Sequence, residues 1–94
     1  MTTPRAQCIR KTVAETIRQH RKASGQSQER LAYRAGIDRS FYGRIERGGQ
    51  NIALETLCLI ALALDVHPSE LLRDIEVADI AEIKNTRSSL LGEK

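Results

Sequence analysis

The chain has 94 residues, 40% hydrophobic and 3% aromatic, so it can form one small domain whose core must be built mainly from aliphatic side chains. Its net charge of +3 conceals a division, because residues 1–50 carry eleven Lys and Arg against four Asp and Glu, whereas residues 51–94 carry four against eight. A basic half of this kind is typical of a surface that binds a polyanion, and the longest apolar run, Leu57–Leu64, is far shorter than the roughly 20 residues that span a membrane.

The first element predicted along the chain is an amphipathic helix over residues 5–24, preceded by a flexible arm at residues 1–4. Ile9, Val13 and Ile17 recur every four residues, so they share one face of the helix. Gly25 is well placed to end it.

Two short helices separated by a glycine are predicted next. Ser27 can cap a helix over residues 28–35, and Asp38 can cap another over residues 39–47. Gly36 lies between them and can adopt the left-handed conformation that a sharp turn requires. We therefore expect two helices that meet at a tight turn.

A fourth helix is predicted over residues 54–64, and its sequence LETLCLIALAL is apolar almost all round. A surface helix needs a single apolar stripe, so this one must be covered on a second side. The core face is predicted to consist of Leu57, Ile60, Ala61 and Leu64. The second face is predicted to meet another copy of the chain or, as the alternative, the chain's own tail; its residues are Leu59, Leu62 and Cys58, the last of which is also compatible with a place in the core.

The C-terminal segment, residues 68–94, has a less regular apolar pattern than the helices predicted before it. Pro68 suits the first turn of a short fifth helix over residues 68–72. Residues 74–84 mix aliphatic and acidic side chains without a clear period, so they are predicted to form a short helix or an extended segment that takes part in assembly. Residues 85–94 are expected to be disordered. The predicted organisation is thus a domain at residues 5–73 and an acidic, partly disordered tail at residues 74–94.

The strings SQERLAYRAG, IDRSFYGRIERG and LETLCLIALALDVHPSELL together resemble the phage-repressor (Cro/cI-like, XRE) helix-turn-helix family. The resemblance implies an all-α, compact five-helix fold of the lambda-repressor type that binds double-stranded DNA. The block DRSFYGRIERGGQN is most similar to the controller proteins of restriction–modification systems, although Ser40, Phe41 and Gln50 depart from their pattern.

In this family the third helix presents its first residues to base edges in the major groove. Arginine can make bidentate hydrogen bonds to guanine, whereas serine predicts no particular base. Phe41 is open to two interpretations, a contact with a thymine methyl group or sugar and packing against the fourth helix. The predicted base contacts are Arg39, Ser40, Arg44 and Phe41.

Phosphate contacts are expected at both edges of this reading helix. The predicted contacts with the DNA backbone are Gln28, Arg47, Gln50 and Asn51. The resemblance also implies that Arg21 and Glu46 form an interior ion pair, which is structural and orients the reading helix.

Catalysis has little support, because His20 and His67 are far apart and no spacing typical of a metal, cofactor or nucleophile site is present. Cys8 and Cys58 form no CxxC pair and no signal peptide is recognisable, so we expect reduced thiols in a cytoplasmic protein. The leading hypothesis is a transcriptional regulator that acts as a homodimer on a near-palindromic operator, in a restriction–modification operon. The alternative is an antitoxin that autoregulates its operon and binds a toxin through its acidic tail.

Overall fold

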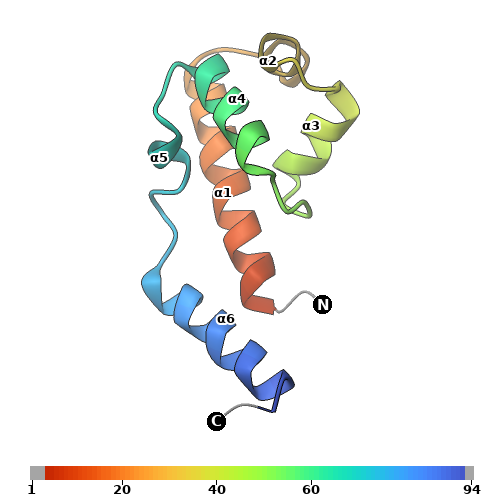
Figure 1. Ribbon diagram of the computed structural model, residues 1–94. Coiled ribbons are helices and arrows are strands. Elements are labelled where there is room, and N and C mark those ends of the chain that lie inside the picture. The colour runs from red at the N-terminus through yellow and green to blue at the C-terminus, as the bar shows by residue number, and fades with distance from the viewer. Residues whose placement is uncertain (1–3, 93–94) are drawn as a thin grey trace.

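A computed structural model describes residues 4–92, with side chains from Cys8 onward, and these residues contain helices and no strand (Figure 1). The helices are α1 Pro4–Ala23, α2 Gln28–Ala35, α3 Arg39–Glu46, α4 Leu54–Leu64, α5 Pro68–Leu71 and α6 Val77–Leu90. The predicted all-α fold is confirmed, and the first five helices begin and end within one residue of their predicted bounds.

The long helix α1 organises the molecule. It contacts α3, α5 and α6, and Figure 1 shows α2 near its C-terminal end and α6 at the opposite end. Val13, Ala14 and Ile17 of α1 are buried, in agreement with the four-residue period of its apolar side chains. The predicted arm is corrected at one position, since Pro4 is already helical; residues 1–3 lie outside the described part of the chain. Proline is favoured in the first turn of a helix because the amide proton it lacks has no partner there.

Helices α1, α2, α3, α4 and α5 share one core, which is mostly aliphatic. It includes Leu31, Ala32 and Ala35 of α2 as well as Leu71 of α5. Among the fully buried residues that the structure describes, Tyr42 is the one with an aromatic side chain. This core fixes the position of α3 against the long helix.

The turn between α2 and α3 has the predicted geometry. Gly36 has φ +70°, and its amide proton is donated to the carbonyl oxygens of Ala32 and Tyr33. Ser27 caps α2 by accepting a hydrogen bond from a backbone amide, and Asp38 caps α3 in the same way. Since a side chain at φ +70° would be strained, glycine permits the chain to reverse direction here.

Helix α4 is buried on one side only. Leu57, Ile60, Ala61 and Leu64 are buried, as predicted for its core face. On the other side Leu59 and Leu62 are 43% and 75% exposed, Leu54 is 69% exposed, and Cys58 is exposed too. Cys58 is therefore not a core residue, because the helical turn places it away from the buried stripe. The tail does not cover this side, since α6 packs against α1.

The expectation of disorder from residue 85 is wrong as far as Leu90, because α6 continues to that residue. The half-buried positions of α6 are Asp79, Ile83, Thr86 and Ser88, and the first three of them recur on one face, so the helix is held by contact with α1. None of its side chains is fully buried, which explains why no apolar period was visible. Residues 93–94 lie outside the described part.

Among the described helices, none is long and apolar enough to cross a membrane.

Candidate nucleic-acid interface

Helix α3 has one face in the core and one face in solvent. Tyr42, Gly43 and Ile45 are buried, whereas Arg39, Ser40 and Arg44 are exposed. Phe41 is half-buried and packs against the core, so its ring is shared between the two faces. The polar side chains predicted to read bases therefore lie on an accessible part of the helix.

The two exposed arginines of α3 each have a neighbour that restricts them. The guanidinium of Arg44 lies over the ring of Phe41, 5.6 Å from its centroid, which is within the range of a cation–π contact. The Nε atom of Arg39 lies 3.8 Å from Oε2 of Glu29 in α2. This contact with Glu29 was not predicted, because ten positions and a turn separate the two residues and only the angle between α2 and α3 brings them together.

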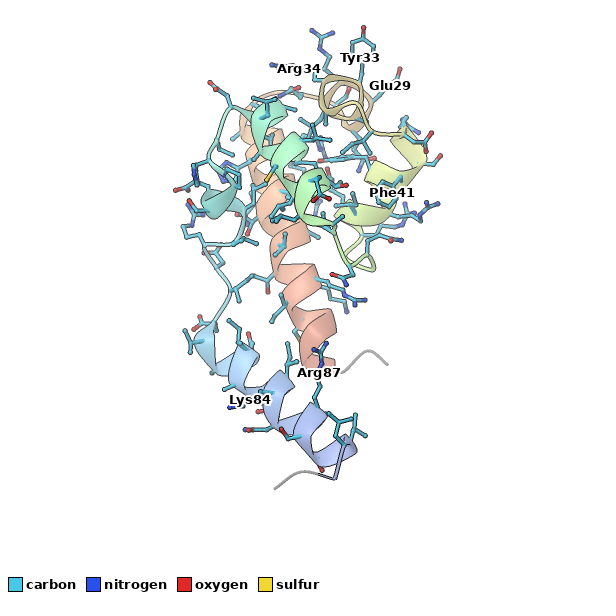
Figure 2. All side chains as sticks on the ribbon, viewed as in Figure 1. Glu29, Tyr33, Arg34, Phe41, Lys84 and Arg87 are labelled. Atoms are coloured by element: carbon cyan, nitrogen blue, oxygen red, sulfur yellow. The ribbon has the colours of Figure 1, made fainter. Side chains whose placement is uncertain are left out.

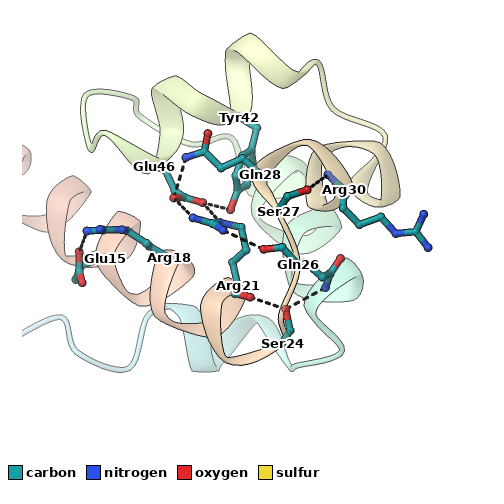
Figure 3. A network of polar contacts seen from close by, with 10 residues as sticks. All are labelled: Glu15, Arg18, Arg21, Ser24, Gln26, Ser27, Gln28, Arg30, Tyr42 and Glu46. Atoms are coloured by element: carbon teal, nitrogen blue, oxygen red, sulfur yellow. Dashed lines mark hydrogen bonds and ion pairs between the residues drawn. The ribbon is translucent and has the colours of Figure 1, made fainter.

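Behind the exposed face lies a buried polar network (Figure 3). Arg21 of α1 donates two hydrogen bonds to Glu46 at the end of α3, from Nε to Oε2 at 2.7 Å and from Nη2 to Oε1 at 3.0 Å. Its Nη1 donates to the carbonyl oxygen of Gln26 at 2.9 Å. The side chains of Arg21 and Glu46 are only 13% and 3% exposed. The structure thus contains the interior ion pair that the family resemblance implies.

Two more groups donate to the same carboxylate. The hydroxyl of Tyr42 donates to Oε2 of Glu46 at 2.5 Å, and Nε2 of Gln28 donates to Oε1 at 3.1 Å. The buried hydroxyl of Tyr42 therefore has the partner it requires. Four donated hydrogen bonds saturate Glu46 and fix the end of α3 to α1 and to the start of α2.

These contacts govern the ionisation of the network. Burial opposes the charge of Glu46, but the hydrogen bonds from Arg21, Tyr42 and Gln28 outweigh it and lower the pKa of Glu46 below its ordinary value of 4.5. The pKa of Arg21 is raised, chiefly by its hydrogen bond to Glu46. Burial, with the hydrogen bond to Glu46, raises the pKa of the Tyr42 phenol far above 10.0. Glu46 is hence ionised and Tyr42 neutral at neutral pH.

Gln28 connects this network to the surface. It is the first residue of α2 and is half-buried. A side-chain amide nitrogen carries two protons, so the bond to Glu46 occupies one and leaves the other available to a phosphate oxygen. The contact with Glu46 was not predicted.

The other edge of α3 is shaped by Gly48. This residue is buried with φ +85°, and a Cβ atom at this position would lie 2.8 Å from Cγ of Lys11 in α1. Arg47 and Asn51 are exposed nearby in the sequence, and Gln50 is half-buried. Gln50 and Asn51 line a groove of about 160 Å³ together with Arg10 of α1. Arg10 was not predicted to lie at this edge.

Among residues 4–92, no group of three or more His, Cys, Asp and Glu side chains is arranged to hold a metal ion.

The part of the chain that contains α2 and α3 is similar to known proteins. A family model described as Helix-turn-helix matches residues 17–71, which is more than half of the chain. The chain belongs to the helix-turn-helix family. This helix-turn-helix protein is 38% identical over 64 residues to the control protein C.SmaI of Serratia marcescens, a match covering 68% of this chain and 76% of that protein.

Two solved structures are similar to it as well. The restriction–modification controller protein C.AhdI from Aeromonas hydrophila has 42% sequence identity and a TM-score of 0.65, over 66% of this chain and 94% of that one. The hypothetical transcription factor NHTF from Neisseria has 39% identity and a TM-score of 0.66, over 68% of this chain and 74% of that one. This helix-turn-helix protein is therefore a DNA-binding transcription regulator with controller-protein homologues, and the prediction that it is not an enzyme is confirmed.

Proposed function

We propose that the protein is a sequence-specific transcription regulator that binds a near-palindromic operator in double-stranded DNA as a homodimer and controls a restriction–modification operon. The observation that carries the proposal is the arrangement of α3. Its exposed face holds Arg39, Ser40 and Arg44, and its opposite side is anchored by Tyr42 and Ile45 in the core. A rigid helix that exposes Arg39 in its first turn and Arg44 in its last turn suits insertion into the major groove.

Affinity in this proposal comes mainly from phosphates, and discrimination from bases. Gln28 would donate the free proton of its side-chain amide to a phosphate oxygen of one strand. At the other edge of α3, the DNA backbone would be contacted by Arg47, Gln50 and Asn51. Arg39 and Arg44 would each address a guanine, which is worth about 1–3 kcal/mol of discrimination per bidentate contact. Phe41 would support Arg44 through the ring contact and meet a neighbouring thymine or sugar with its exposed part.

The dimer is proposed on the uncovered side of α4. Leu59 and Leu62, with Cys58 beside them, form an exposed apolar face on a helix whose other side is core. A second copy that presents the same face would bury both patches around a twofold axis. Two reading helices could then contact half-sites about one helical turn apart, and their contributions to specificity would combine.

The restriction–modification role is proposed because C.SmaI and C.AhdI are named as control or controller proteins. The antitoxin alternative gains no support from the proteins compared or from the structure, and we do not pursue it.

Selection of bound duplexes from a random DNA pool tests the proposal. We expect two inverted half-sites with their centres about 10 base pairs apart and a guanine at a fixed position in each. Recovery of duplexes without a common sequence would contradict sequence-specific binding, and a single unrepeated half-site would contradict the dimer.

Sedimentation tests the interface independently of DNA. Leu62→Asp should convert a wild-type dimer into a folded monomer, because it places a charge in the proposed contact. The matched control is Val77→Asp, since Val77 is 80% exposed on α6 and outside the proposed interface. A Leu62→Asp protein that sediments like the wild type would contradict the assignment.

A further inference from the structure

Glu29 is an acidic side chain on a surface that is otherwise suited to a polyanion. It belongs to the first turn of α2, and its side chain is 80% exposed (Figure 2). The other acids of the region from residue 28 to 47 have structural tasks, since Asp38 caps α3 and Glu46 is held in the buried network. Glu29 has neither task. Its carboxylate instead lies beside the guanidinium of Arg39.

The geometry of this pair leaves Arg39 able to read a base. Oε2 of Glu29 approaches Nε of Arg39 at 3.8 Å. A guanidinium has donors on Nε and on both Nη atoms, in a fixed plane. A carboxylate held at Nε therefore leaves the two Nη groups free to donate to O6 and N7 of one guanine.

The energetics differ between the free protein and a DNA complex. In solution both side chains are mostly exposed, so the pair contributes little to stability. In a complex the surrounding water is displaced, and the attraction between carboxylate and guanidinium is stronger in the less polar medium. The same carboxylate repels every phosphate near it. Glu29 should consequently lower affinity for DNA in general while it restricts Arg39 to one orientation.

We propose that Glu29 is a specificity-determining positioning residue, which holds Arg39 across the α2–α3 junction so that its Nη groups meet one guanine. This inference rests on the proposed function, because it requires that α3 reads bases. It makes the distinctive prediction that loss of the carboxylate increases affinity and decreases selectivity at the same time.

The test uses the full-length protein, the operator recovered by duplex selection and a scrambled duplex of equal length and composition. Fluorescence anisotropy gives the dissociation constant for each DNA at one fixed salt concentration. For Glu29→Gln we expect tighter binding to the scrambled duplex and a fall of about threefold to tenfold in the ratio of operator to scrambled affinity, a part of what one arginine–guanine contact provides. Because Glu29 is exposed, the variant should fold, and circular dichroism checks that it does.

The matched control is Glu15→Gln. It removes the same charge from another exposed Glu–Arg pair, in which Glu15 lies 3.5 Å from Arg18 on α1. Its ratio of operator to scrambled affinity should stay at the wild-type value. In an Arg39→Ala background, Glu29→Gln should change the ratio less than twofold, since there is then no arginine to position.

Two outcomes would overturn the inference about Glu29, and a third would contradict the proposed function on which it rests. An unchanged ratio in Glu29→Gln would reduce Glu29 to a general electrostatic effect and overturn the inference. An equal fall in the Arg39→Ala background would show that Glu29 acts without Arg39 and would also overturn it. A wild-type protein with no preference between the two duplexes would instead contradict the proposed function.

Discussion

Loss of Arg21 should destabilise the protein far more than loss of Arg21 and Glu46 together. The substitution Arg21→Met keeps much of the side-chain volume and removes both hydrogen bonds from the guanidinium to Glu46. The carboxylate keeps only the neutral donors Tyr42 and Gln28, in a place where its side chain is 3% exposed. A buried charge would then lack its counter-charge.

The expected magnitude follows from this burial. Breaking a buried ion pair from one side costs about 3–5 kcal/mol, against a total stability of about 5–15 kcal/mol for a domain. In the double variant Arg21→Met/Glu46→Leu no charge is stranded. The remaining loss of about 1–2 kcal/mol comes from neutral groups that have lost a partner, chiefly the buried hydroxyl of Tyr42, with the amide of Gln28 and the carbonyl oxygen of Gln26 beside it. The single variant should therefore be the less stable of the two.

Urea unfolding followed by far-ultraviolet circular dichroism measures both effects. The midpoint for Arg21→Met should fall by about 2–4 M relative to the wild type. The pH dependence gives a second signature. In the wild type the lowered pKa of Glu46 provides stability that is complete above its ordinary value of 4.5 and is lost as the pH falls through the folded-state pKa. In Arg21→Met the stranded carboxylate should have a raised pKa, so acid should neutralise it and narrow the gap between the two proteins.

Two results would refute this reasoning. One is a double variant that is less stable than Arg21→Met, which would mean that the network acts through packing alone. The other is a gap between wild type and Arg21→Met that is as wide at pH 4 as at pH 7, which would mean that the charge of Glu46 does not matter.

Further outcomes concern the reading surface and the fold around it. Arg39→Ala should reduce operator affinity by about 1–3 kcal/mol and leave binding to a scrambled duplex almost unchanged, as anisotropy titrations would show. Gln28→Ala should weaken binding to both duplexes by a similar factor in the same assay, because a phosphate contact carries no sequence information. Gly48→Ala should destabilise the protein by about 1–2 kcal/mol in urea, since a methyl group there is strained at φ +85° and meets Lys11. Truncation after Ile75 should remove the circular dichroism signal of α6 yet preserve DNA binding.

Each of these predictions can be contradicted by a specific result. Equal losses on both duplexes would remove Arg39 from the base-reading residues, and a loss confined to the operator would remove Gln28 from the phosphate contacts. For Gly48→Ala the control is Gly49→Ala, because a Cβ atom at Gly49 would meet nothing within 4 Å. Equal stability of the two variants would contradict the argument from close packing. A truncated protein that no longer binds DNA would give α6 a role that the structure does not explain.

Much of the fold was predictable because its signals are local. A capping side chain such as Ser27 or Asp38 satisfies amide groups within three residues, and the glycine turn at Gly36 depends on the backbone of a single residue. These features set the bounds of α2 and α3 whatever the rest of the chain does. The core face of α4 was also predictable, since burial of Ile60 and its neighbours follows the helical period.

What escaped prediction depends on the angles between helices. The contact from Gln28 to Glu46 joins the start of α2 to the end of α3, and the pairing of Glu29 with Arg39 joins the starts of both helices. Spacing along the sequence gives no measure of such distances. For residues 74–84 the sequence left a short helix and an extended segment open, and the continuation of α6 to Leu90 was not predicted. The contact of α6 with α1 leaves no residue fully buried and therefore no apolar stripe.

The central claim is that the exposed face of α3 enters the major groove and contacts base edges. Guanine N7 lies in that groove, so methylation interference on the selected operator tests the claim most directly. We predict that methylation of one guanine in each half-site prevents binding by the wild type, and that Arg39→Ala no longer distinguishes methylated from unmethylated DNA at that position. Binding that is indifferent to N7 methylation at every guanine of the operator would contradict the account.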